Sequence, residues 1–155
     1  MKKILIALDY DPSAQIIAEK GYQLASSMNA SVILLHVVSD PTYYSSLNYS
    51  PIMGFDSFSN LDVVQTGAVD SLKNAAQSYL DKTREFLGGK NITSVIKEGD
   101  FGDGILEAAQ ETGADIIVMG THSRRGIDKI LMGSVAEKVL HHSTVPLFII
   151  PKTKT

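Results

Sequence analysis

The residues best suited to chemistry lie in the segment DIIVMGTHSRRGIDKILMGSV, residues 115–135. Its first apolar residues predict a buried strand, and the polar loop that follows contains glycines and the adjacent pair Arg124 and Arg125. A helix is predicted to begin at Gly133 and Ser134. Backbone N–H groups after a parallel strand, the positive end of a helix dipole and glycines that permit close approach all favour an anion. The segment therefore predicts a phosphate site, although glycines and solvated arginines also occur in ordinary surface loops.

The spacing within this segment is more specific than its composition. Gly120 is followed by two residues, then Ser123, then nine residues, then Gly133 and Ser134. This order resembles the G-x2-G-x9-G-[S/T] signature of the ATP-binding branch of the universal stress protein family, with Ser123 in place of the second glycine. Four segments resemble that family in the same order, namely MKKILIALD, SVILLHVV, GADIIVMGTHSRRG and GSVAEKVLHHSTVPLFIIP. Residues 41–60 have no clear counterpart.

The resemblance implies a site for ATP or AMP, with Mg²⁺ or Mn²⁺ present only together with the nucleotide phosphates. The phosphates would meet backbone and hydroxyl groups of Gly120, Ser123, Gly133 and Ser134, and the triphosphate path would be lined by Thr121, His122, Arg124 and Val135. The base would be flanked by Met119 and the backbone at Val37. The ribose would lie near Ala7 and Asp9. For Asp9 a turn-forming role fits equally well. Ser134 also fits as a plain helix N-cap.

Composition limits the class of protein. The 155 residues are 44% hydrophobic and 20% charged, which is typical of one globular domain. A net charge of −3 with scattered lysines and arginines argues against a nucleic-acid partner. The chain has no cysteine, so disulfides and thiolate chemistry are excluded, and a cytoplasmic location is expected. The apolar run near the start stops at Asp9, too early for a signal peptide, and no segment is expected to cross a membrane.

Hydrophobic periodicity predicts strands that alternate with helices along the chain. The predicted strands are residues 3–8, 31–38, 91–97, 115–119 and 145–150, and the predicted helices are residues 14–28, 61–87, a segment around 105–109, and 133–142. Such alternation predicts a doubly wound parallel α/β sheet with helices on both faces. The family resemblance implies the strand order 3-2-1-4-5. The winding then reverses between the first and fourth strands, where Asp9 and Gly120 would meet at the carboxyl edge.

Several other residues carry weaker expectations. His36 lies within an apolar strand and is expected to be structural. Residues 99–104 are expected to form a turn in which Asp103 caps the next helix. The strand at 91–97 should lie at a sheet edge. Residues 41–60 are expected to form a long variable loop. We hypothesise that its three tyrosines, Tyr43, Tyr44 and Tyr49, close over the bound base.

Four functions remain open from the sequence. The leading one is a regulatory stress-response protein that binds ATP without turning it over and engages a protein partner in a nucleotide-dependent way. A slow ATP-using enzyme is less favoured because the chain lacks a G-x-x-x-x-G-K-[S/T] loop, and His122 has no identifiable carboxylate partner. A receiver domain would use Asp9 and Asp11 but leaves residues 120–134 unexplained. The fourth is a dimer that binds no nucleotide, which Ser123 keeps open.

Two further expectations concern association and metal. The apolar strand at residues 145–150 is predicted to pair antiparallel with its symmetry mate in a homodimer, as the family resemblance implies. His141 and His142 are adjacent on a helix and point in different directions, so no metal site is expected there.

Overall fold

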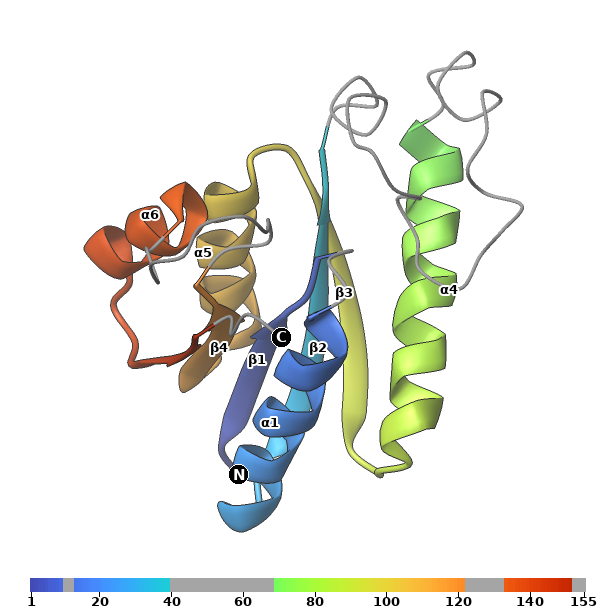
Figure 1. Cartoon of the computed structure of the whole chain (residues 1–155), viewed down its shortest axis with the longest axis vertical. Helices are drawn as coiled ribbons and strands as arrows, with labels where there is room; N and C mark the ends of the chain where they lie inside the picture. Colours follow the sequence, from blue (N-terminus) through green and yellow to red (C-terminus); the bar gives the residue numbers. More distant parts are fainter. Residues whose placement is uncertain (10–12, 40–68, 122–132, 152–155) are drawn as a thin grey trace.

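The computed structural model describes residues 1–9, 13–39, 69–121 and 133–151. These residues contain a five-stranded sheet in the order β3-β2-β1-β4-β5, in which every neighbouring pair is parallel (Figure 1). The strands are β1 (Lys3–Ala7), β2 (Ser31–Val38), β3 (Ile92–Glu98), β4 (Ile116–Gly120) and β5 (Leu147–Ile150). The predicted doubly wound fold and its strand order, 3-2-1-4-5, are confirmed.

Four described helices cover the two faces of this sheet (Figure 1). They are α1 (Ala14–Ser27), α4 (Val69–Leu87), α5 (Phe101–Thr112) and α6 (Ser134–His142). α1 and α4 contact each other and pack on one face, whereas α5 and α6 pack together on the other. The predicted helix at 61–87 is described from Val69 onward, and residues 61–68 lie outside the described part of the chain.

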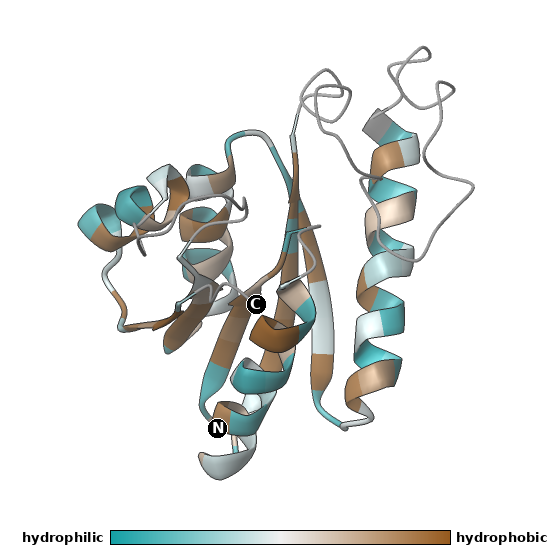
Figure 2. Cartoon of the chain, in the orientation of Figure 1, coloured by the Kyte–Doolittle hydropathy of each residue, from teal (hydrophilic) through white to brown (hydrophobic). Residues whose placement is uncertain are grey.

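The central strands are apolar on both faces because helices cover both faces. Within β1, Ile4 and Ile6 face the cluster under α1, and Leu5 faces the cluster under α5 and α6. All three side chains are fully buried. Figure 2 shows the consequence, with hydrophobic strands inside and hydrophilic residues on the outer surfaces of the helices. The central strands β1, β2 and β4 are therefore nearly continuous apolar runs and do not alternate in polarity.

Two helix boundaries refine the sequence predictions. Asp100 is the N-cap of α5, and its side chain accepts a hydrogen bond from the backbone N–H of Asp103 at 3.0 Å. The expectation that Asp103 is the cap was therefore wrong. It also follows that residues 99–104 are not all turn, since α5 begins at Phe101. An N-cap carboxylate must precede the helix to reach its first N–H groups, and Asp103 lies inside the first turn.

The two edge strands agree with prediction, with one change. β3 lies at one edge, as expected. β5 lies at the other, but it starts at Leu147 and not at residue 145. The hydroxyl of Ser143 donates to the Val145 carbonyl and accepts from the Val145 N–H, at 2.7 and 3.1 Å. This local turn draws Val145 out of the strand. Among the helices that the model describes, none combines the length and apolar character needed to cross a bilayer.

Candidate functional site

The candidate site lies at the carboxyl ends of β1 and β4. These strands are neighbours, with Ile6 level with Val118, yet the chain leaves β1 for α1 on one face and leaves β4 toward α6 on the other. Helices that depart to opposite faces cannot fill the space between the two strand ends, which is why ligands bind at such reversals. The expected meeting place of the segments after β1 and β4 is therefore present.

The end of β1 is tied to β2 and to α4. Leu8 continues the ladder beyond the last residue of β1, half-buried Ala7, because its N–H donates to the Leu35 carbonyl at 2.9 Å. Asp9 follows and is partly exposed, and its carbonyl accepts a hydrogen bond from the Tyr79 hydroxyl of α4 at 2.8 Å. A side chain of α4 thus fixes the position of the Asp9 backbone. Sequence reasoning had no signal for Tyr79, because the two residues are 70 positions apart.

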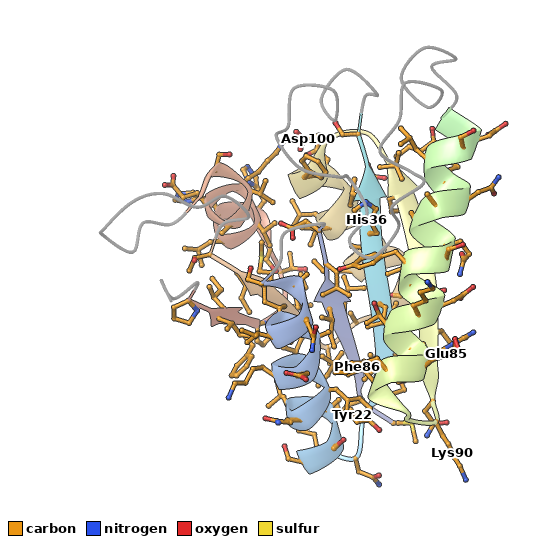
Figure 3. All side chains as sticks on the ribbon, turned by 45° about the vertical axis from the view of Figure 1, so that its right-hand side comes forward. Tyr22, His36, Glu85, Phe86, Lys90 and Asp100 are labelled. Carbon is orange, nitrogen blue, oxygen red and sulfur yellow. The ribbon has the colours of Figure 1, made fainter. Side chains whose placement is uncertain are left out.

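His36 of β2 reaches the same segment. Its side chain is 2% exposed, and its Nδ1 lies 2.8 Å from the Leu8 carbonyl oxygen. Burial lowers the pKa of His36 from 6.5 to about 4, and the hydrogen bond to Leu8 opposes this more weakly. The ring is neutral at pH 7, in agreement with a structural role. Figure 3 shows His36 toward the carboxyl end of β2.

The end of β4 is joined directly to the start of α6. The Thr121 N–H donates to the Ile150 carbonyl at 3.2 Å, which ties Thr121 to β5. The Thr121 carbonyl accepts from the Gly133 N–H at 2.8 Å. Thr121 and Gly133, the described residues on either side of 122–132, are therefore joined by a hydrogen bond. The helix start predicted at Gly133 and Ser134 is confirmed, and this hydrogen bond places it next to the end of β4.

Gly133 is the N-cap of α6, so Ser134 is its first helical residue and not the cap. Gly133 has φ −72° and ψ 166°, a conformation open to any residue. The backbone conformation at position 133 therefore does not require glycine. Having no side chain, Gly133 cannot itself cover the helix N-terminus, where the first N–H groups lack intrahelical partners.

Gly120 has a packing role that sequence reasoning missed. A Cβ atom on Gly120 would lie 2.5 Å from Cδ1 of Ile17 on α1. The side chain of Ile17 occupies that space and is itself buried. The glycine thus lets α1 approach the end of β4, whatever its role toward a ligand.

The predicted base-flanking residues lie at this edge with their side chains in the core. Val37 and Met119 are each 4% exposed, and both belong to the cluster under α5 and α6. Val135 packs against the same cluster, and Thr121 is 5% exposed. The side chains of Val37 and Met119 are therefore part of the core. The expectations for His122, Ser123 and Arg124, and for Tyr43, Tyr44 and Tyr49, fall outside the described residues.

An ion cluster joins α5 to α6 beside this edge. Lys138 Nζ lies 3.0 Å from Asp100 Oδ2 and 2.9 Å from Asp103 Oδ1. The pKa of Asp100 is lowered, mainly by the hydrogen bond from the Asp103 backbone N–H and next by Lys138. The pKa of Lys138 is raised, mainly by Asp103 and next by Asp100. Gly102 makes room, since a Cβ there would lie 2.7 Å from Lys138 Cδ. Lys138 is thus engaged by two carboxylates.

These features define the class as a doubly wound α/β protein with its candidate site at the reversal of winding. A sequence model of the universal stress protein family matches residues 1–151. The chain belongs to this family. It is 29% identical over 155 residues to Universal stress protein MJ0531 of Methanocaldococcus jannaschii, covering 99% of this chain and 84% of that protein.

Solved structures share the fold. Protein MJ0577 of the same organism superposes with a TM-score of 0.75 at 24% identity, covering 99% of this chain and 98% of the other. A universal stress protein in complex with cAMP gives a TM-score of 0.62 at 19% identity and 96% coverage of both chains. The universal stress protein of Archaeoglobus fulgidus in complex with dAMP gives 0.57 at 19% identity and 98% coverage of both.

Proposed function

We propose that this protein binds an adenine nucleotide, with ATP as the favoured ligand, at the carboxyl ends of β1 and β4. The observation that carries the proposal is the hydrogen bond from the Gly133 N–H to the Thr121 carbonyl. It holds the N-terminus of α6 against the end of β4. An anion at that point would meet helix N–H groups and the positive end of the helix dipole together. Two proteins of the same fold hold adenine nucleotides, cAMP and dAMP.

The other proposed contacts follow the position of each segment. The ribose would lie at Ala7 and Asp9, and the base against the backbone of Val37 and Met119. The phosphates would lie along Gly120, Thr121, Gly133, Ser134 and Val135, together with His122, Ser123 and Arg124. Among the described residues, no group of three His, Asp or Glu side chains is arranged to hold a metal ion. Mg²⁺ or Mn²⁺ would accordingly arrive on the nucleotide phosphates.

The proposed mode of action is nucleotide-dependent binding in the cytoplasm, and not turnover. A slow ATP hydrolase is an alternative from the sequence, but His36 at this edge does not supply the general base that it would need. A general base must reach the attacking water, and His36 is buried with Nδ1 committed to the Leu8 carbonyl. Binding that changes a partner's state needs no such group.

A homodimer through β5 is the proposed assembly. β5 pairs only with β4 in the described sheet, so its other edge is open. Phe148 on this strand is 41% exposed, and Leu140 on α6 is 50% exposed. An open apolar edge strand is a ready template for pairing with a second copy.

The first experiment is to release and identify the ligand of freshly purified protein by mass spectrometry. Melting temperature and calorimetric titration with Mg-ATP should then show binding in the wild type and loss in Gly133→Val. The φ and ψ of Gly133 are extended and open to any residue, so valine adds no backbone strain there. Its side chain would occupy the approach to the helix N-terminus.

His141→Val, at the opposite end of α6, is the matched control and should bind ATP as the wild type does. Unchanged ATP affinity in Gly133→Val would contradict the proposed site. Turnover near the typical enzyme rate of about 10 per second, lost in Gly133→Val, would show that the protein is an enzyme.

A further inference from the structure

Two side chains from different elements converge on consecutive carbonyl groups after β1. His36 Nδ1 lies 2.8 Å from the Leu8 carbonyl oxygen, and the Tyr79 hydroxyl donates to the Asp9 carbonyl oxygen at 2.8 Å. The two rings also contact each other edge to face, with centroids 6.1 Å apart and planes at 78°. His36 comes from the sheet and Tyr79 from α4, so the contact joins two layers of the fold.

The chemistry of these contacts assigns the proton on the imidazole. A carbonyl oxygen can only accept, so Nδ1 of His36 must carry the hydrogen that lies toward Leu8. The buried ring is neutral at pH 7, and a neutral imidazole has one N–H. His36 is therefore held as the Nδ1–H tautomer, a donor in a fixed direction.

The two carbonyls fix the conformation of one residue. The Leu8 carbonyl belongs to the peptide plane before the Cα of Asp9, and the Asp9 carbonyl belongs to the plane after it. Peptide units are planar, so the relative orientation of these two planes is set by φ and ψ of Asp9 alone. Holding both planes therefore sets the direction of the Cα–Cβ bond from which the Asp9 carboxylate extends.

We propose that His36 and Tyr79 are positioning residues that orient Asp9 toward the ribose of a bound adenine nucleotide. This inference rests on the proposed function, and it adds a second part to the site. The helix N-terminus at Gly133 would bind the phosphates, and His36 and Tyr79 would position Asp9 on the ribose side. Neither side chain needs to touch the nucleotide, because each acts through the backbone of Leu8 and Asp9.

Tyr79→Phe is the sharpest variant, since it keeps the ring against His36 and removes only the hydroxyl. ATP affinity should fall about fivefold, as for one lost hydrogen bond, while affinity for inorganic triphosphate should stay within about twofold. A merely structural loss would weaken both ligands together. Tyr22→Phe is the control, because Tyr22 lies on α1 toward the opposite end of the sheet (Figure 3).

A double-mutant cycle tests whether Tyr79 acts through Asp9. In an Asp9→Ala background, Tyr79→Phe should cause no further loss of ATP affinity. A full fivefold loss in that background would overturn the proposal. For the imidazole, His36→Asn retains an N–H donor near the position of Nδ1 and should bind ATP better than His36→Leu, which has none.

A nucleotide-free measurement separates this inference from the proposed function. In the NMR spectrum of the apo protein, Tyr79→Phe should shift or broaden the backbone resonances of Leu8 and Asp9, and Tyr22→Phe should leave them unchanged. Unaltered Leu8 and Asp9 resonances in Tyr79→Phe would overturn the positioning role even if ATP binds. Wild-type protein that binds no ATP would instead overturn the proposed function, and with it the ribose-side role, whatever the spectra show.

Discussion

Acid should destabilise this protein through His36, and the size of the effect follows from its burial. The imidazole is 2% exposed and donates through Nδ1 to the Leu8 carbonyl, so the folded state holds it neutral with a pKa of about 4. In the unfolded chain the pKa returns to 6.5. Because the folded pKa is the lower one, the unfolded state binds the proton first as pH falls.

The sign and the pH window are therefore determined. This contribution to stability is fully present above pH 6.5, falls between pH 6.5 and about 4, and is constant again below that range. One pH unit between the two pKa values corresponds to about 1.4 kcal/mol, so the full loss is about 3 kcal/mol. At pH 5 the loss should be about 2 kcal/mol, a large part of the stability of an ordinary domain.

Urea unfolding at pH 7, 6 and 5, followed by circular dichroism, measures the free energy of unfolding of wild type and His36→Asn. Surface carboxylates also lose favourable interactions in acid, but they do so in both proteins, so the difference between the two pH profiles isolates His36. The asparagine variant has a smaller side chain and should be less stable at pH 7. Its disadvantage should shrink by about 2 kcal/mol at pH 5. Parallel profiles for the two proteins would refute the reasoning, since they would show that His36 does not titrate differently on unfolding.

Three other predictions address the phosphate loop, a helix cap and the dimer. Ser123→Gly should change ATP affinity by less than about tenfold in calorimetry, because the about 1 to 2 kcal/mol that a left-handed backbone would cost a serine at this position would be offset by the hydrogen bond that its hydroxyl would give to a phosphate, whereas Ser123→Val should weaken ATP binding by more. ATP binding found only in Ser123→Gly would show that strain dominates. Asp100→Ala should lower the free energy of unfolding by about 1 kcal/mol in urea, and Asp100→Asn, which still caps α5, by clearly less; equal losses would assign the effect to Lys138 and not to the cap. Phe148→Glu should convert a dimer to a monomer in sedimentation velocity, and a wild-type monomer at micromolar concentration would remove the dimer from the proposal.

Much of the fold could be predicted because its causes are local in sequence. Buried parallel strands such as β2 appear as unbroken apolar runs, and α1 ends where Asn29 adopts a positive φ of 56°. The position of the candidate site also follows, since alternating strands and helices place Gly120 and Asp9 on one edge. The strand order came from family resemblance, because periodicity alone does not choose among the possible orders of five parallel strands.

What only the tertiary structure decided depends on contacts between residues far apart in the chain. Tyr79 and Asp9 are separated by 70 positions and Lys138 and Asp100 by 38, and such pairs leave no periodic pattern in a single sequence. The packing of Ile17 against Gly120 is of the same kind. The sequence by itself predicted which residues would bind phosphate and that Gly120 and Gly133 would lie where β4 ends. The packing of α1, α4 and α6 on the sheet decided how the backbone around them is held, because each hydrogen bond and close approach there requires two elements to be in place at once.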